Sequence, residues 1–130
     1  MKDIKFRAWD YDTNTMVYPD SELETIFCFD KVGLSIYQAN GRELSSFEIM
    51  QYTGFKDKNG KEIYEGDIIE FRHNNGHMTK DYVMFENGRF TTELGYNIHY
   101  FVMRRDGVKV VGNVYQDKGY KAYIDYPDGL

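Results

Sequence analysis

The sequence predicts a mainly β chain, folded as a single small domain of short antiparallel strands in an SH3-like or partly open barrel, with at most one or two short helices. The composition carries this prediction, because 12 Tyr and 9 Phe favour strands and 12 Gly suit the many turns of a small β-protein. A chain of 130 residues can also bury one hydrophobic core and is too short for two comfortable ones. An α+β fold is the alternative.

The first 52 residues are predicted to hold three strands and the chain's one credible helix. Residues 2–10 partly alternate apolar and polar side chains, as a strand with one buried face does. Residues 24–29 and 33–38 are expected to form two more short strands. The segment from Glu43 to Tyr52 is the candidate helix, although its apolar stripe is incomplete. An irregular connection ending at Gly54 is the alternative.

An Asp-rich stretch after the first strand admits two interpretations. Asp10, Asp12 and Asn14 imitate the first ligands of a calcium-binding loop. The match fails where Thr15 replaces the required glycine and Ser21 replaces the required bidentate Glu. We therefore expect an ordinary turn, for which Asp and Asn side chains are well suited.

The stretch from Gln51 to Phe71 contains the clearest signals of turns and strands. Asn59-Gly60 predicts a tight reversal, because glycine adopts positive φ without steric cost. The segment 67–71 is rich in β-branched and aromatic residues and predicts a strand. The acidic side chains Asp57, Glu65 and Asp67 are expected to serve turns and solvation rather than acid-base chemistry.

A hairpin is predicted between residues 68–73 and 78–85, with Asn74-Asn75-Gly76 at its tip. A two-residue turn would place Glu70 opposite Asp81, and like charges that face each other are unfavourable. A bulge or a longer loop is therefore the alternative register.

The C-terminal part is predicted to add strands at 97–103 and 108–115. We expect a β-rich domain over residues 1–118 and an aromatic C-terminal tail over residues 119–130. The tail contains Tyr120, Tyr123 and Tyr126 and would dock on the core or on a neighbouring molecule.

No reactive constellation is found in the sequence, and we predict no catalytic residue, no metal site and no cofactor. The chain lacks a phosphate-binding loop, a dinucleotide fingerprint, a cysteine-rich zinc pattern and a nucleophile elbow. In a two-residue hairpin His73 and His77 would point to opposite faces and could hardly share an ion. The lone Cys28 is expected to fill the core.

The charge of the chain disfavours nonspecific binding to nucleic acid or to an anionic membrane. Lys and Arg number 16 against 21 Asp and Glu, which gives a net charge of −5. A local basic patch remains compatible with this total. A single cysteine and the lack of a long apolar run predict a protein of the cytoplasm, with no role in a membrane.

Three blocks of the sequence resemble the YopX family of phage and prophage proteins. The first block is Ile4-Lys5-Phe6-Arg7-Ala8-Trp9-Asp10, and the last is Val110-Val111-Gly112-Asn113-Val114-Tyr115. Between them lies Gln51-Tyr52-Thr53-Gly54, followed by the run from Lys56 to Asp67. The resemblance implies a phage-encoded accessory protein in a bacterial host cell and supplies no catalytic residues.

The sequence thus leads to a noncatalytic protein-interaction or self-assembling module as the expected function, with a homo-oligomer as one form of it. The alternative is a small β-barrel that binds nucleic acid through residues 52–72. In either case the expected interaction surface contains basic and aromatic side chains, which are Tyr52, Phe55, Lys56, Lys58, Lys61, Tyr64 and Arg72.

Overall fold

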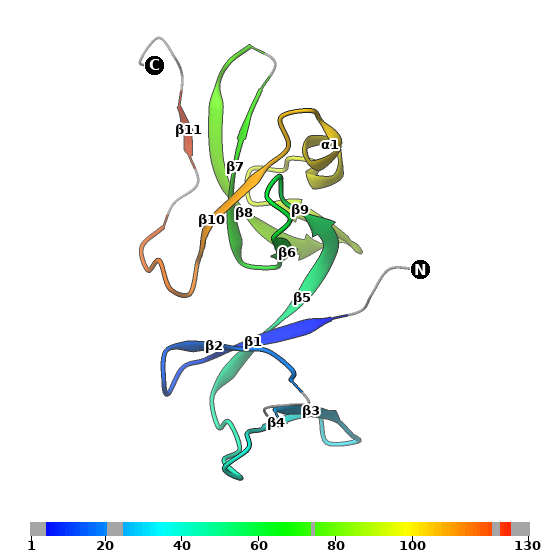
Figure 1. The fold of residues 1–130 in the computed structure, drawn as a ribbon, viewed down its shortest axis with the longest axis vertical. Coiled ribbons are helices and arrows are strands. Elements are labelled where there is room, and N and C mark those ends of the chain that lie inside the picture. Colours follow the sequence, from blue (N-terminus) through cyan, green and yellow to red (C-terminus); the bar gives the residue numbers. More distant parts are fainter. Residues whose placement is uncertain (1–4, 21–24, 74, 121–122, 126–130) are drawn as a thin grey trace. The chain divides into compact units, whose positions relative to one another are not determined.

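The computed structural model describes residues 5–20, 25–73, 75–120 and 123–125. The predictions for residues 2–4, Ser21, Glu24, Asn74, residues 121–122 of the tail and the tail from Tyr126 onward lie outside these residues. Eleven strands and one short helix make up the described elements (Figure 1). The mainly β prediction, with at most two short helices, is therefore confirmed.

The chain divides into two compact units, Lys5–Gln51 and the residues from Tyr52 onward. We call them the N-terminal unit and the C-terminal unit, and each is described by itself. Strand β5 runs from one unit into the other. None of the described helices is long and apolar enough to cross a membrane.

In the N-terminal unit, a central strand pairs antiparallel with a neighbour on each side. The N-terminal unit contains β1 (Phe6–Asp10), β2 (Thr15–Val17), β3 (Ile26–Phe29), β4 (Leu34–Tyr37) and the start of β5 (Phe47–Lys56). Strand β1 pairs with both β2 and β5, and β3 pairs with β4 in a separate hairpin. The core of this unit consists of Ala8, Val17, Ile36 and Leu44.

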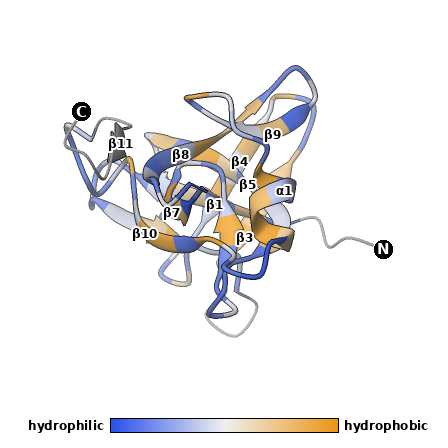
Figure 2. Ribbon diagram, turned by 90° about the horizontal axis from the view of Figure 1, so that it is seen from above, coloured by the Kyte–Doolittle hydropathy of each residue, from blue (hydrophilic) through white to orange (hydrophobic). Residues whose placement is uncertain are grey.

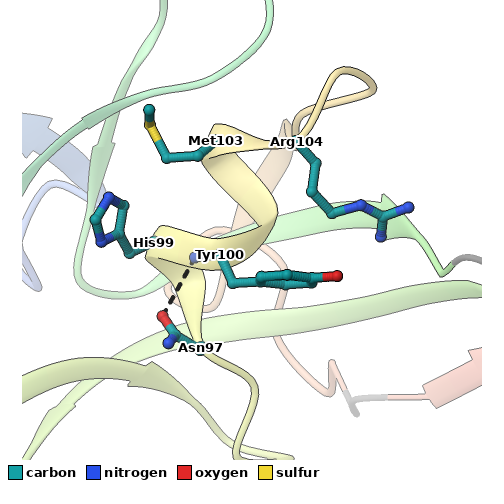
Figure 3. Close-up of a pocket in the computed structure, with 5 residues that line it drawn as sticks. All are labelled: Asn97, His99, Tyr100, Met103 and Arg104. Atoms are coloured by element: carbon teal, nitrogen blue, oxygen red, sulfur yellow. Dashed lines mark hydrogen bonds between the residues drawn. The ribbon is translucent and has the colours of Figure 1, made fainter.

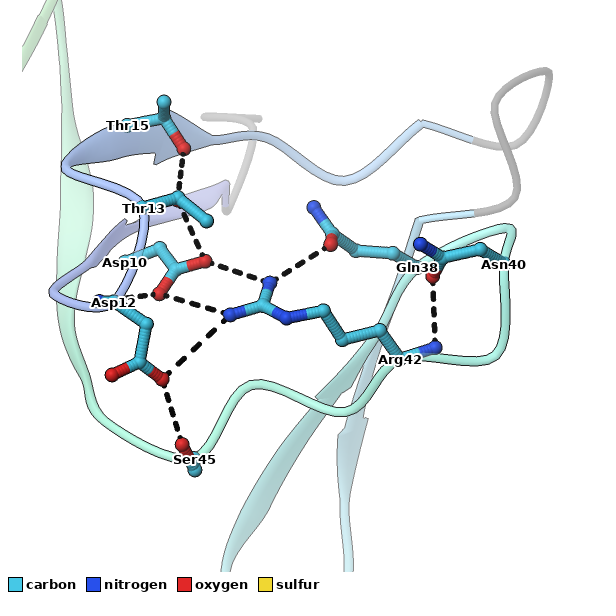
Figure 4. Close-up of polar contacts among 8 residues, drawn as sticks. All are labelled: Asp10, Asp12, Thr13, Thr15, Gln38, Asn40, Arg42 and Ser45. Atoms are coloured by element: carbon cyan, nitrogen blue, oxygen red, sulfur yellow. Dashed lines mark hydrogen bonds and ion pairs between the residues drawn. The ribbon is translucent and has the colours of Figure 1, made fainter.

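The polar residues after β1 form the expected turn and hold an arginine (Figure 4). Asp10 is fully buried, and its Oδ2 accepts hydrogen bonds from Arg42 Nη1 at 2.8 Å and from Thr13 Oγ1 at 2.9 Å. Burial alone would raise the pKa of Asp10, but the hydrogen bonds from Arg42, Thr13 and the Asp12 amide outweigh burial and lower it. Asp10 and Asp12 thus surround the guanidinium of Arg42, which ties the turn to the segment after β4.

The C-terminal unit is built on a sheet that curls into a half-barrel. Its strand order is β10-β7-β8-β11, with β9 paired to the other end of β8. The remaining elements are β6 (Glu62–Tyr64), β7 (Asp67–Arg72), β8 (Met78–Glu86), β9 (Arg89–Thr92), α1 (Ile98–Met103), β10 (Lys109–Asn113) and β11 (Tyr123–Asp125).

Apolar side chains from β6, β7, β8, α1 and β10 form one core in the C-terminal unit. Figure 2 colours helix α1 largely hydrophobic, whereas most loops are hydrophilic. The buried members of this core are Ile63, Ile69, Phe71, Val83, Ile98, Phe101, Val108 and Val110. Helix α1 is therefore part of the core and not an appendage.

The predicted helix at Glu43–Tyr52 is wrong, because residues 47–51 belong to strand β5 and pair with β1. Met50 is buried while Ile49 next to it is exposed, as expected for neighbours on opposite faces of a strand. The incomplete apolar stripe of this segment had no helical face to bury, so pairing with β1 decides its structure.

The predicted strand at 97–103 is also wrong, because these residues form helix α1. Asn97 is the N-cap, and its side chain accepts a hydrogen bond from the Tyr100 amide at 3.3 Å. Ile98 and Phe101 are the buried residues, three positions apart as on one face of a helix. Alternation of apolar residues was thus a misleading signal here.

The hairpin of β7 and β8 takes the longer-loop register. Glu70 lies opposite Lys80, not Asp81, and Lys109 of β10 lies opposite Glu70 on its other side. Glu70 therefore has a cation on each neighbouring strand, which is a favourable cross-strand arrangement.

Two smaller predictions fail for reasons of register. The His73 amide donates to the His77 carbonyl at 2.8 Å, so the two histidines face each other across the hairpin instead of pointing to opposite faces. Cys28 is exposed, because Phe27 takes the inward position of β3 and Cys28 lies opposite Ser35.

Candidate functional site on helix α1

Helix α1 is short and is stabilised by the packing of its inward face on the core. Six residues are too few for an isolated helix to be stable in water, so tertiary contacts must stabilise this one. The ring of Phe101 packs against Phe71 with 4.3 Å between centroids, and Tyr96 packs edge-on against both rings. These contacts fix the side chains on the opposite, outward face of α1.

The outward face of α1 carries large side chains that remain exposed. Tyr100 is 51% exposed and Met103 is 70% exposed. Together with Asn97, His99 and Arg104 they line an open recess of about 440 Å³ (Figure 3). We call these five residues the α1 surface.

The turn between β5 and β6 borders the α1 surface on one side. The ring of Phe55 stacks on His99 with 5.2 Å between centroids and 16° between planes. The Lys58 amide donates to the Val108 carbonyl at 2.9 Å, and a Cβ placed on Gly107 would lie 3.2 Å from Lys58 Cβ. The turn thus contacts α1 at His99 and the chain after the helix at Gly107 and Val108. The exposed Lys58 lies in this turn, whereas Lys56 follows Phe55 in β5 and points to the opposite face of that strand.

Asp57 holds this turn in shape. Its Oδ1 accepts from the amides of Asn59 and Lys61, and its Oδ2 accepts from the amide of Val110 at 3.0 Å. Burial alone would raise the pKa of Asp57, but the three backbone donors and the charge of Lys61 lower it below its usual value. The carboxylate thus joins the turn to β10.

Arg104, one of the five residues of the α1 surface, connects the helix to strand β7. Arg104 Nη1 donates to the Arg72 carbonyl at 2.7 Å, and its guanidinium lies 5.8 Å from the Tyr100 ring and 5.4 Å from the Phe101 ring. Arg72 itself is exposed and donates to the Gly76 carbonyl. Arg72 lies between Phe71 and His73, which both pack against Phe101, so its side chain points to the opposite face of β7.

His73 lies within the cluster of aromatic rings that surrounds Phe101. Its ring contacts Phe71, Tyr96 and Phe101, and its Nε2 lies 2.7 Å from Thr79 Oγ1. Burial lowers the pKa of His73 below 6.5, and the nearby charges of His77 and Arg104 lower it further. The neutral ring is the form that this cluster favours.

Acidification should therefore destabilise the protein through His73. A histidine with a lowered pKa binds fewer protons when folded than when unfolded, so the free energy of unfolding falls as the pH drops from about 6.5 toward the folded pKa. Urea unfolding at pH 7 and pH 5 measures this loss, which we expect to be smaller in His73→Gln. His99 is exposed, so His99→Gln is the control. If both variants lose the same free energy of unfolding between pH 7 and pH 5, the assignment to His73 is contradicted.

The structure brings together only part of the predicted interaction surface. Phe55 and Lys58 border the α1 surface, whereas Lys56 and Arg72 point to the opposite faces of their strands. Tyr52 and Tyr64 are instead buried and pack on each other with 5.4 Å between ring centroids. Lys61 is exposed at the end of the β5–β6 turn.

Sequence reasoning missed His99, Tyr100, Met103 and Arg104, because the segment was expected to be a strand. The signal that would have found them is Asn97 as an N-cap, followed by Ile98 and Phe101 at helical spacing. Such a helix places the residues between its buried positions on the outer face.

Comparison with known proteins identifies the family but no described activity. No curated protein matches this chain. A crystal structure of protein EF1440 from Enterococcus faecalis is similar, with 26% sequence identity and a TM-score of 0.62 over 92% of this chain and 98% of that one. The family model described as YopX protein matches residues 5–119. The chain therefore belongs to the YopX protein family.

Proposed function

We propose that this chain is a phage-encoded accessory protein that acts as a noncatalytic interaction module and binds its partner through the α1 surface. The phage origin is supported by the YopX family, which occurs in phages and prophages. A bacterial cytoplasm is the corresponding location. The partner is another macromolecule, with a second copy of the chain included in that class.

The observation that carries this proposal is the exposure of Tyr100 and Met103 on a rigid support. Tyr, Met and Arg are enriched at the centres of binding interfaces, and Arg104 lies beside both exposed residues. The buried contacts of Phe101 hold them in place before any partner arrives. Such preorganisation reduces the entropy lost on binding, so a small surface can contribute useful affinity.

The proposal is tested by substitution of the exposed residues, with the fold left intact. Tyr100→Ala removes the aromatic ring, and Met103→Asp puts a carboxylate in place of the most exposed apolar side chain of the α1 surface. Light scattering after size-exclusion chromatography, over a wide range of concentrations, measures self-association. Affinity capture from phage-infected host cells measures partner binding, and we expect these variants to lose whichever complex the wild type forms.

Phe85→Ala is the matched control, because Phe85 is 49% exposed and therefore resembles Tyr100 in exposure but lies on β8. It should retain the complex. A wild-type chain that stays monomeric at every concentration and captures nothing, or a complex that both kinds of variant weaken equally, would rule out the α1 surface as the contact surface.

A further inference from the structure

We propose that two copies of this chain associate through the open edge of strand β3, with the two β3 strands paired antiparallel about a two-fold axis at Cys28. This inference goes beyond the proposed function, because β3 lies in the N-terminal unit and shares no residue with the α1 surface. Three sets of observations carry it. They concern the backbone groups of β3, its side chains, and the register that both allow.

Strand β3 has one covered edge and one open edge among the residues that the structure describes. On the covered edge it pairs with β4, and at the end of this hairpin the amides of Asp30 and Gly33 each donate to the carbonyl of the other, at 2.9 and 3.2 Å. In an antiparallel pair, residues that bond to the neighbour alternate with residues whose backbone groups point away from it. Counting back from Asp30, Cys28 bonds to β4, whereas Phe27 and Phe29 direct their N–H and C=O groups to the open edge.

The open edge is short and has a definite end on each side. Two positions before Phe27, the backbone groups of Thr25 and Asp20 exchange hydrogen bonds at 2.8 and 3.1 Å. After Phe29 the chain turns at Asp30. In the part of the chain that the structure describes, nothing bonds to the outward N–H and C=O groups of Phe27 and Phe29. Because such groups bind another strand, the partner that fits this edge is an extended segment of protein.

The side chains of β3 do nothing to prevent strand pairing. Proteins protect an open edge with charged side chains or with proline. Strand β3 reads Ile26-Phe27-Cys28-Phe29 and contains neither. Ile26 is 53% exposed and Phe29 is 63% exposed, and these two residues lie on opposite faces of the strand. A second strand along the edge would therefore cover apolar surface on both faces.

The unpaired backbone groups determine how two identical strands fit together. In a two-fold pair, each contact is repeated with the roles of the copies exchanged. If Phe27 lies opposite Phe29 of the second copy, all four unpaired groups of each copy are used. If Phe27 lay opposite Phe27, Phe29 would face Thr25, whose groups already bond to Asp20. The first register is thus the favoured one, and it places Cys28 opposite Cys28 of the second copy.

Cys28 therefore reports on this register. The two Cys28 residues form a pair without hydrogen bonds between them, so their Cα atoms lie about 4.5 Å apart. A disulfide spans Cα distances of about 4.4–6.8 Å, and Cys28 is exposed. With diamide as oxidant, the two thiols give up two protons and two electrons to the N=N bond of diamide and form one S–S bond. The disulfide marks the pair and is not needed to form it.

The first test is the rate of disulfide formation by the full chain in diamide, followed on non-reducing gels and assigned by mass spectrometry. The control is Cys28→Ser combined with Val32→Cys, because Val32 is 97% exposed in the turn of the same hairpin. Val32 lies four positions from the axis, so its two copies would be roughly 27 Å apart in the proposed pair. Random collision favours the more exposed control, whereas β3 pairing should make the wild type at least tenfold faster.

The second test measures the dimer without a disulfide, by sedimentation velocity of the reduced chain over a wide range of concentrations. So short an edge predicts a weak dimer whose fraction rises with concentration, and Cys28→Ser should retain it. Phe29→Lys places a cation beside Phe27 of the second copy and should raise the dissociation constant at least tenfold. Phe85→Lys, the same change at a phenylalanine that is 49% exposed on β8, should alter it less than threefold.

The inference is overturned if the Val32→Cys control forms its disulfide as fast as the wild type, if both Phe→Lys variants weaken the dimer equally, or if the reduced chain stays monomeric at every concentration. Its failure is distinguishable from failure of the proposed function. A dimer lost in Tyr100→Ala but retained in Phe29→Lys belongs to the α1 surface and overturns pairing through β3. A dimer lost only in Phe29→Lys belongs to β3, and capture of another macromolecule then decides the role of the α1 surface.

Discussion

Replacement of Asp57 by alanine is expected to destabilise the protein by about 2–4 kcal/mol, because it leaves three backbone N–H groups without their acceptor. The donors belong to Asn59, Lys61 and Val110, and the carboxylate that they share is almost fully buried. Denaturant unfolding of the wild type and of Asp57→Ala at pH 7 measures the difference. Asp57→Asn should be intermediate, since an amide oxygen can keep the two bonds within the turn.

Asp106→Ala is the control for this change, because Asp106 is an exposed aspartate in a turn. We expect it to alter the free energy of unfolding by less than about 0.5 kcal/mol. The difference between the wild type and Asp57→Ala should also shrink in acid. The lowered pKa of Asp57 means that its stabilisation is complete above the unfolded value of about 3.8 and is lost as the pH falls through the folded value. A difference that stays constant down to pH 2 would contradict a role for the charged carboxylate.

The turns of this chain could be predicted from sequence because their physics is local. Asn59-Gly60 and Asn75-Gly76 bring their own backbone preferences, and Gly60 and Gly76 do adopt positive φ in the structure. The overall β character follows from the same kind of signal, since aromatic and β-branched residues between turns suit strands wherever they occur.

The two errors in secondary structure share a cause, which is that both segments are decided by contacts distant in sequence. Residues 47–51 become a strand because β1 offers them a pairing edge. Residues 98–103 become a helix because Ile98 and Phe101 fill a core built by β7, β8 and β10. Local periodicity carries no information about either partner.

Only part of the candidate site could be predicted, because the rest depends on contacts that are distant in sequence. Phe55 and Lys58 were found from their type and from their position near a turn. Lys56 and Arg72 were named by type, but strand alternation points their side chains away from the helix. Tyr52 and Tyr64 belong to that set by type only, because cross-strand pairing of β5 with β6 places both side chains in the interior. His99, Tyr100 and Arg104 depend on the helix itself, and so they were invisible while the segment was taken as a strand.

Replacement of Phe101 by alanine is expected to have the other large effect, a loss of about 3–5 kcal/mol in the free energy of unfolding. Phe101 is 8% exposed and contacts Phe71, His73, Tyr96 and the guanidinium of Arg104. Removal of the ring opens a cavity in the core and takes away the main anchor of a six-residue helix. Denaturant unfolding gives the magnitude, and hydrogen exchange of residues 98–103 shows whether the helix opens first.

Met103→Ala on the same helix is the control, because Met103 is 70% exposed and should change the stability by less than about 0.5 kcal/mol. The pair separates the two faces of α1. Phe101→Ala should lose binding because the outward residues lose their support, whereas Met103→Ala should leave the helix protected from exchange. Helix amides that stay protected in Phe101→Ala would show that the helix is held by Ile98 and Val108 alone, and the α1 surface would then be independent of the aromatic cluster beneath it.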